Sequence, residues 1–381
     1  MAYMTDILYF DNAATTAMSK QALETYVSVA TNYMGNPSAL HKEGLKAKAL
    51  LQEKRESIAQ HLGVQASTLT FTSGATEANA LVLNNLIWAP QSGHAVLSNI
   101  EHPSMKEHAR ILRQLGWSLT FLNAPHGFVN PEDVQAALTE KTRFVGCMLV
   151  NNVVGSIQNV GTLVSLVREY QKKSNRKIHF HTDAVQALGK IPFSLTELGV
   201  DSASFSAHKF KGPQGVGLLY NIDPALQPLS RGGNQENGIR PGTENLAGIA
   251  AMGTALDEAF AHLEENSQRV EKINHFLRSE LSFLPILSPS EHASPYILTI
   301  SVKPLPSEVF TRMLYDRGFC VSSGSACSNN AKQKGESVLT SMLVRSDEAK
   351  SSVRLSFGYD TTFAEAESLA STIKTLYREL T

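Results

Sequence analysis

Short apolar runs alternate with helical patterns through the middle of the chain. Such runs, rich in Val, Ile, Leu and Phe, occur at residues 94–100, 143–150, 177–181, 202–206 and 216–220. Runs of this length predict strands that are covered on both faces. Residues 42–62 predict a helix, because apolar side chains recur there at spacings of seven and four. Strands that alternate with helices predict an α/β fold with a mostly parallel sheet, in which ligands bind beyond the carboxyl ends of the strands.

The pattern changes after about residue 258. A charged helical segment is followed by short strand and helix patterns, which predict strands at 296–301, 319–322 and 353–357 and helices at 259–280, at 307–317 and at the end of the chain. Residues 284–295 predict a surface loop. We therefore expect a large domain of residues 16–258 and a small α+β domain of residues 1–15 and 259–381. No long linker separates them, so the two should pack closely.

Composition narrows the class of protein. Among 381 residues, 34 Lys and Arg oppose 35 Asp and Glu, a net charge of −1. This balance argues against direct binding to nucleic acid, which needs a basic surplus. The three cysteines exclude a disulfide scaffold and favour a reducing compartment. No signal peptide or membrane span is predicted, so a cytoplasmic location is expected.

Two motifs follow predicted strands. Residues 72–77 (TSGATE) precede a helical run, so Gly74, Ala75 and Thr76 could present N–H groups and a hydroxyl to a phosphate. An ordinary helix N-cap is the alternative. Asp183 ends another strand, where its carboxylate could pair with the protonated ring nitrogen of pyridoxal phosphate. Helix capping by Asp183 is again the alternative.

Lys209 follows a buried strand and precedes a Gly-Pro turn. Schiff-base lysines need such a desolvated setting, since imine formation requires a neutral amine. Ser206 and His208 beside it could bind phosphate. A solvated loop lysine is the alternative, and it fits Lys211 better than Lys209. Because Asp183 lies 26 residues earlier, about one helix and one strand away, the two could meet at neighbouring strand ends.

Cys327 lies among Ser, Gly, Ala and Asn in residues 322–330, as expected for an exposed loop. An exposed thiol with a lowered pKa can act as a nucleophile. An incidental loop thiol is an equally good interpretation of this residue alone. Cys147 and Cys320 lie in apolar runs and are interpreted as packed core thiols.

Two further side chains could carry chemistry. His102 follows a predicted strand and could stack on a ring or move protons, with a surface histidine as the alternative. Arg354 lies in an apolar run, which suggests a bidentate carboxylate partner, with a structural salt bridge as the alternative. No metal site is predicted.

Taken in order, the motifs resemble those of cysteine desulfurases of the NifS/IscS type. They are YFDNAATT (9–16), GNPSALH (35–41), TSGATE (72–77), EH (101–102), NN (151–152), the Asp183 and Lys209 motifs, RPGTEN (240–245), SGSAC (323–327) and SSVR (351–354). The resemblance runs nearly from end to end. It implies a class V aminotransferase-like enzyme of the fold-type I (aspartate aminotransferase-like) pyridoxal 5′-phosphate superfamily, with a seven-stranded, mostly parallel sheet.

The resemblance also implies roles for the motif residues. Lys209 holds the cofactor, Asp183 pairs with its ring nitrogen and His102 stacks on the ring. Gln186 binds the ring hydroxyl, Asn152 lies near the cofactor and the substrate carboxylate, and Arg354 binds that carboxylate. The phosphate is cradled by a set that includes Thr243 of a second subunit, which implies a homodimer. The full set is Gly74, Ala75, Thr76, Ser206, His208 and Thr243.

The implied reaction converts L-cysteine to L-alanine. Lys209 takes the α-proton, and the Cys327 thiolate then attacks the substrate sulfur and becomes a persulfide. The sulfur passes to an acceptor protein, either an iron–sulfur scaffold or a tRNA sulfurtransferase. Two alternatives are a selenocysteine lyase or other class V relative, which needs no catalytic cysteine, and a catalytically weak sulfur-relay or scaffold protein.

The chain departs from the family at three places. Val153 replaces the usual Glu after the Asn pair, so a carboxylate near the cofactor is lost. KQKG (332–335) stands where the family has Leu-Glu-Pro after the cysteine. The chain ends at Thr381, where members that feed an iron–sulfur scaffold often have a longer tail. We therefore hypothesise a dedicated acceptor, such as a tRNA-thiolation protein.

Overall fold

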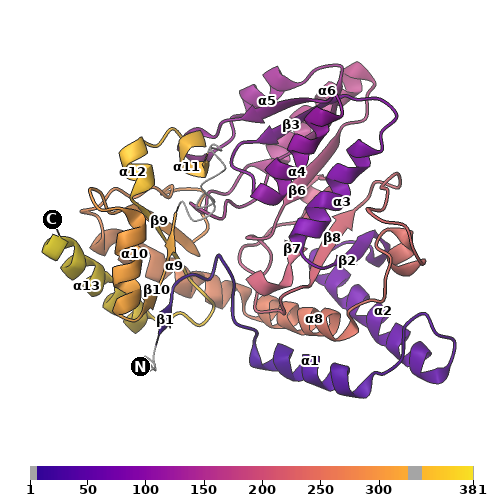
Figure 1. Cartoon of the computed structure of the whole chain (residues 1–381), viewed down its shortest axis with the longest axis horizontal. Helices are drawn as coiled ribbons and strands as arrows, with labels where there is room; N and C mark the ends of the chain where they lie inside the picture. Colours follow the sequence, from indigo (N-terminus) through magenta and orange to yellow (C-terminus); the bar gives the residue numbers. More distant parts are fainter. Residues whose placement is uncertain (1–6, 325–336, 381) are drawn as a thin grey trace.

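The computed structural model describes residues 7–324 and 337–380. A seven-stranded sheet in the order β2-β8-β7-β6-β5-β3-β4 forms its larger half (Figure 1). The strands are β2 (Leu69–Thr72), β3 (His94–Ser98), β4 (Ser118–Leu122), β5 (Thr142–Gly146), β6 (His179–Asp183), β7 (Ser202–Ser206) and β8 (Gly217–Asn221). Only β8 runs antiparallel to its neighbours, β2 and β7. The expected α/β fold with a mostly parallel sheet is therefore confirmed.

Helices cover both faces of this sheet because side chains alternate along each strand. On β3, Ala95 and Leu97 pack with residues of α3 and α4, whereas Val96 belongs to the core cluster that contains residues of α2, α6 and α8. The helices of this half are α1 (Lys20–Asn32), α2 (Lys42–Leu62), α3 (Ala75–Ile87), α4 (Pro103–Gln114), α5 (Pro131–Ala137), α6 (Val160–Ser174), α7 (Leu195–Leu198) and α8 (Leu246–Ala261). Short 3-10 turns lie at η1 (Ala66–Thr68), η2 (Pro125–Gly127), η3 (Ala207–Lys209) and η4 (Gln235–Gly238).

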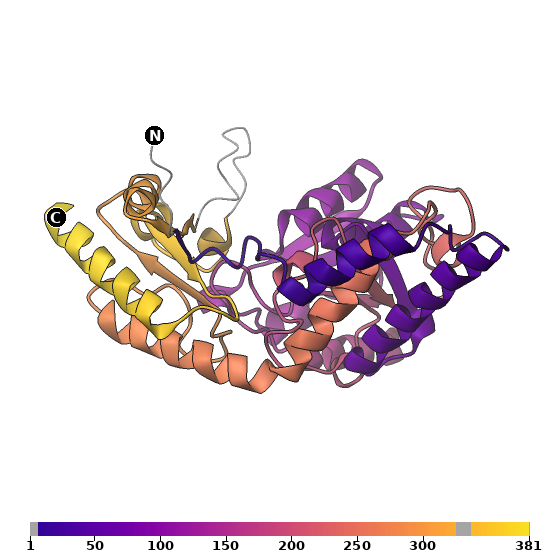
Figure 2. The ribbon, with the colours of Figure 1, turned by 90° about the horizontal axis from the view of Figure 1, so that it is seen from below.

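A second group of elements has its own core. An antiparallel sheet, β11 (Ser322–Ser323)-β12 (Ser352–Ser356)-β9 (Ile297–Ser301), lies beside a parallel pair, β1 (Leu8–Tyr9)-β10 (Phe319–Cys320). Its helices are α9 (Leu263–Glu280), α10 (Ser307–Asp316), α11 (Val338–Ser341), α12 (Ser346–Lys350) and α13 (Phe363–Leu380). Phe10 and Ala13 from the N-terminal segment are part of this core. Figure 2 shows α8 and α9 running one after the other beneath the two halves. The domain boundaries at residues 15 and 258 stay a prediction.

Several sequence expectations needed correction. Strand β4 was missed, because it lies at the sheet edge and four of its five residues are only partly buried or exposed. Strand β5 ends at Gly146, so Cys147 follows the strand, although it is buried as expected. Cys320 is only partly buried, because Phe319 takes the inward position of the two-residue strand β10.

Two further features concern membranes and metals, within the part of the chain that the structure describes. No helix in that part is long and apolar enough to span a membrane. Within 7–324 and 337–380, no group of three or more His, Cys, Asp and Glu side chains is arranged to hold a metal ion.

Candidate active site

A cavity of about 640 Å³ opens where β6 and β7 end. Asp183, the last residue of β6, and Ser206, the last residue of β7, both line it, because these parallel strands are neighbours. Its wall also includes residues 13–15 and residues 322–324 of the second half. The predicted site residues that line it are Gly74, Ala75, Thr76, His102, Asn152, Asp183, Gln186, Ser206, His208, Lys209 and Arg354. The tertiary structure thus gathers eleven predicted residues in one cavity.

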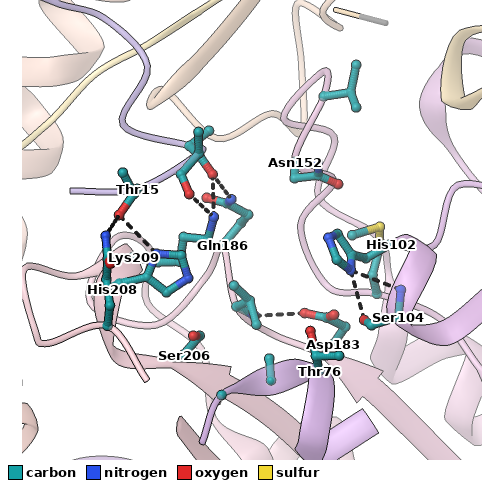
Figure 3. A pocket seen from close by; sticks show the side chains of 18 of the residues that line it. Thr15, Thr76, His102, Ser104, Asn152, Asp183, Gln186, Ser206, His208 and Lys209 are labelled. Carbon is teal, nitrogen blue, oxygen red and sulfur yellow. Dashed lines mark hydrogen bonds between the residues drawn. The ribbon is translucent and has the colours of Figure 1, made fainter. Parts of the chain in front are cut away.

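Lys209 enters the cavity from η3, directly after β7. Its Nζ donates hydrogen bonds to the carbonyl oxygens of Ala13 at 2.7 Å and Ala14 at 2.6 Å. Figure 3 shows Lys209 and Gln186 on one side of the pocket and His102 on the other. Lys211 does not line the cavity and forms an ion pair with Asp360 at 2.9 Å.

Asp183 is buried and held by two donors. Its Oδ1 accepts from the backbone N–H of Val185 at 3.1 Å, and its Oδ2 accepts from Asn79 Nδ2 at 3.0 Å. Helix capping by Asp183 is the wrong interpretation, because the next helix, α7, begins only at Leu195. The carboxylate is therefore fixed at the floor of the cavity by its neighbours.

Asn79 connects Asp183 to a buried histidine. Because the carboxylate only accepts, Asn79 must direct its Nδ2 at Asp183 and its Oδ1 at His181. Oδ1 then accepts from His181 Nε2 at 2.9 Å, and the Ser202 hydroxyl donates to His181 Nδ1 at 2.8 Å. Burial, aided by the charge of His179, lowers the pKa of His181 to about 3. A neutral His181, with one donor and one acceptor nitrogen, fits these bonds.

His102 caps helix α4 and faces the cavity. Its Nδ1 accepts from the Ser104 backbone N–H at 3.1 Å and from the Ser104 hydroxyl at 2.8 Å. The same hydroxyl accepts from Asn79 Nδ2 at 2.9 Å, so Asn79 links His102 to Asp183. Burial lowers the pKa of His102, which favours the neutral ring. The surface-histidine alternative does not fit this partly buried position.

The turn between β2 and α3 brings the N-terminus of α3 to the cavity. Gly74 is the N-cap of α3 without a side-chain cap, while Glu77 accepts from the Ser73 N–H, so the capping interpretation holds in part. A Cβ at Gly217 on β8 would lie 2.4 Å from Gly74 Cα, so only glycine permits this approach. Helix N-termini bind phosphate through free N–H groups and the helix dipole.

Two further side chains lie where they could contribute to binding a phosphate. Ser206 ends β7, and His208 follows it in η3 with Nδ1 at 3.1 Å from the Thr15 hydroxyl. Burial, aided by the charges of Lys209 and Lys190, lowers the pKa of His208 to about 4. The neutral imidazole can still donate one hydrogen bond.

Arg354 approaches the cavity from β12. Its Nη2 forms an ion pair with Asp11 Oδ1 at 2.7 Å, and its Nη1 donates to the Asn152 carbonyl oxygen at 2.8 Å. Among the described residues, no partner accepts a hydrogen bond from its buried Nε. The salt-bridge interpretation is therefore confirmed, while the pocket position leaves carboxylate binding open.

Three predicted features stand apart. Thr243 is exposed, does not line the cavity and accepts a hydrogen bond from Asn36 Nδ2 at 3.4 Å. Cys327 and the segment 332–335 lie outside the described residues. Val153 lines the cavity and packs with Leu339 and Met342.

Sequence reasoning missed the residues that hold the site together. Asp11 and His181 stand inside motifs that were noticed, but neither received a role. Asn79, Ser104 and Lys190 were given no role, and their bonds to Asp183, His102 and Gln186 are seen only in the structure. Asn79, for example, meets Asp183 across 104 positions of sequence.

Comparisons with known proteins indicate the same family as the sequence motifs. The family model described as "Aminotransferase class-V" matches residues 8–369. A "NifS/IcsS protein homolog" of Lactobacillus delbrueckii subsp. bulgaricus is 39% identical over 98% of this chain and 97% of its own length. A "Cysteine desulfurase IscS" of Dictyoglomus turgidum is 35% identical over 93% of this chain and 90% of its own. A solved structure of a "NifS-like protein" superposes with a TM-score of 0.90 at 32% identity, covering 97% of this chain and 99% of the other.

Proposed function

The chain belongs to the class-V aminotransferase family, among the cysteine desulfurases of the NifS/IscS type, and we propose that it transfers sulfur from L-cysteine through a persulfide on Cys327. One observation carries the proposal: Lys209, Asp183 and His102 line a single cavity at the ends of β6 and β7. These are the side chains that a pyridoxal-phosphate site requires for attachment, ring pairing and stacking.

The donor set of the cavity fits pyridoxal 5′-phosphate. The N-terminus of α3 with Ser206 and His208 would bind the phosphate, and Asp183 would pair with the ring nitrogen. Lys209 would bind the aldehyde carbon of the cofactor covalently, as a Schiff base. When bound, this cofactor supplies an electron sink for the negative charge left at the substrate α-carbon.

The residues of the chain would then divide the work on the substrate. Arg354 and Asn152 would bind the carboxylate of L-cysteine, and Lys209 would take the α-proton. The Cys327 thiolate would attack the substrate sulfur, and the carbon–sulfur bond would break with its electron pair left on carbon. That carbon, the β-carbon, would take a proton, and Lys209 would return the α-proton to the α-carbon, which gives L-alanine while Cys327 keeps the sulfur as a persulfide. The step balances without an external oxidant.

Replacement of Cys327 tests this function. Cys327→Ser should abolish alanine and sulfide formation from L-cysteine, while the cofactor absorbance near roughly 420 nm, expected of a Schiff base to Lys209, stays. Cys320→Ser is the matched control and should keep turnover, because Cys320 contributes no nucleophile to the proposed reaction. Full turnover by Cys327→Ser would instead favour a selenocysteine lyase-like mechanism. Absence of the absorbance band from the unaltered protein would favour a scaffold role.

A homodimer and a protein acceptor are parts of the same proposal. Thr243 does not line the cavity of its own chain, so it would contribute to the phosphate site of a second copy. The acceptor would be an iron–sulfur scaffold or a tRNA sulfurtransferase, and a dedicated acceptor is our hypothesis. Sulfur transfer from labelled Cys327 persulfide to each class of acceptor, compared side by side, distinguishes them. Transfer to an iron–sulfur scaffold alone would overturn the hypothesis of a dedicated acceptor.

A further inference from the structure

Lys190 is a buried lysine next to the active site that the proposed chemistry does not use. Its exposed fraction is 2%, and its Nζ donates to Gln186 Oε1 at 2.8 Å. Burial, aided by the positive charges of Lys209 and Arg354, lowers the pKa of Lys190 to about 7. Burying an amine among cations lowers the stability of the fold. The burial of Lys190 against Gln186 therefore calls for an explanation.

Lys190 stands at one end of a chain of three hydrogen bonds. Lys190 donates to Gln186 Oε1, and Gln186 Nε2 donates to the Ala13 carbonyl oxygen at 2.9 Å. Lys209 Nζ donates to the same Ala13 carbonyl at 2.7 Å. Two lysines are thus joined through one glutamine amide and one shared acceptor.

The donor and acceptor types fix the orientation of the Gln186 amide. The Ala13 carbonyl only accepts, so Nε2 must face Ala13, and Oε1 is then left to accept from Lys190 Nζ. The amide nitrogen carries two hydrogens, of which Ala13 takes one. Since Gln186 lines the cavity, the second hydrogen is the one it can offer to a ligand there.

We propose that Lys190 is a positioning residue that holds Gln186 as a hydrogen-bond donor to the cofactor, and thereby lowers the pH at which the cofactor–Lys209 imine loses its proton. This inference rests on the proposed function, because it requires that the cavity bind pyridoxal phosphate through Lys209. A hydrogen bond donated to the cofactor's ring oxygen beside the imine stabilises the deprotonated imine. Loss of the fixed donor should therefore raise the pH midpoint of the visible absorbance.

The surroundings of Lys190 supply a competing explanation through charge alone. The positive charges of Lys209 and Arg354 lower the pKa of Lys190, and the charge of Lys190 lowers the pKa of His208. Lys190 Nζ also lies 5.9 Å from the centre of the Tyr296 ring. Removing one positive charge from this group would also raise the midpoint. The test must therefore separate orientation of Gln186 from charge.

The experiment is a spectroscopic pH titration of the cofactor-loaded protein. Lys190→Met should raise the midpoint by about one pH unit, the size expected for loss of one hydrogen bond. In a Gln186→Leu background the same substitution should cause no further shift, because the residue through which Lys190 acts is gone. Lys190→Arg, which keeps a charged donor, should restore the original midpoint.

A second buried lysine provides the matched control. Lys106 is 8% exposed, acts on His102 by charge, and donates to the Asn99 carbonyl oxygen instead of to Gln186. Lys106→Met should leave the midpoint within about 0.2 pH units, at most one fifth of the shift expected for Lys190→Met. If Lys190→Met fails to fold, Lys190→Gln replaces it. An amide can present oxygen or nitrogen, so it no longer dictates the orientation of Gln186, and a smaller upward shift is expected.

Three outcomes overturn the inference. They are an unshifted midpoint in Lys190→Met or Lys190→Gln, an equal shift in Lys106→Met, and a shift that persists undiminished in the Gln186→Leu background. The unaltered protein separates these failures from failure of the proposed function. If it shows no cofactor absorbance, the proposed function is overturned and this inference with it.

Discussion

Glu101 lies directly before His102 and is fully buried. Its Oε1 accepts from the Ser98 hydroxyl and from the Met148 N–H, the latter at 2.6 Å, while its buried Oε2 has no hydrogen-bond partner among the described residues. Burial, opposed by the Ser98 bond and reinforced by the charge of Asp183, raises the pKa of Glu101 to about 7. A protonated Glu101 therefore belongs to the stable form of the fold near neutral pH.

This raised pKa makes stability depend on pH. The stabilising contribution is complete below pH 4.5 and is lost as the pH rises through about 7, because the folded protein then must bury a charge. Glu101→Gln keeps the oxygen that accepts from Ser98 and Met148 and removes the ionisation. Urea unfolding at pH 5 and pH 8 should show a smaller fall in unfolding free energy for this variant than for the unaltered protein. An exposed control, Glu140→Gln, should follow the unaltered protein, and equal falls in all three would contradict the prediction.

At the same scale, the sequence identified the groups that face the ligand better than those that hold them. Lys209 and Asp183 were found because their chemistry is uncommon after a buried strand. Asn79 and Lys190 were not, because an amide or a lysine on a helix or turn has many ordinary uses. The fold alone brings Asn79 within 3.0 Å of Asp183, and it alone joins Gln186, the neighbour of Lys190, to Ala13 across 173 positions of sequence.

Strand β8 shows how an element shapes the site without contributing to it chemically. Gly217 pairs with Thr72 on one side and Ser206 on the other, so it holds both edges of the phosphate cradle in register. Gly217→Ala would force its Cβ against the Gly74 backbone, and we expect a loss of about 2 kcal/mol or more in unfolding free energy from overpacking. Cofactor affinity, measured by fluorescence titration, should fall as well.

The control for this prediction is a glycine with free space around it. Gly161 in α6 has no atom within 4 Å of the place where a Cβ would lie, and Gly161→Ala should be neutral or slightly stabilising. Unchanged stability and cofactor affinity in Gly217→Ala would contradict the prediction, because the turn between β2 and α3 would then make room for the Cβ without loss of free energy.

Val153 illustrates where sequence reasoning about an element was incomplete. The comparison with the family suggested only that a carboxylate had been lost. In the structure, Val153 is buried in an apolar cluster with Leu339 and Met342, which belong to α11 and the residue after it. The position therefore joins the cavity wall to α11, and a contact of this kind cannot be inferred from one chain position.

At the scale of the whole molecule, the two most exposed large apolar side chains of the described residues lie in one stretch of sequence, residues 23–45. Leu40 is 91% exposed and Met34 88% exposed, and Leu23, Val27 and Leu45 are each at least half exposed. Asn36, inside this stretch, is the residue that bonds Thr243. Exposed apolar surface of this kind is typical of an interface between proteins. It supports the proposed homodimer, with Thr243 beside the interface.

The dimer can be tested at this surface. Leu40→Glu would place a charge in the proposed interface, so sedimentation should show a larger fraction of single chains and desulfurase activity should fall with it. Trp88→Glu, at a residue 63% exposed at the end of α3, is the control and should leave the mass unchanged. An unaltered protein that sediments as a single chain would contradict the proposal.

The sequence by itself determined the α/β class, the strands that carry the site and eleven of the residues that line it. It could do so because the buried strands recur as short runs between helical patterns, and because reactive groups directly at their ends are where ligands of such a fold bind. Only the tertiary structure decided how those groups are held. Arg354 meets Asp11 across 343 positions of sequence, and Lys209 reaches the Ala13 carbonyl across 196. Such pairings depend on the path of the folded chain through space, which local patterns of residues do not encode.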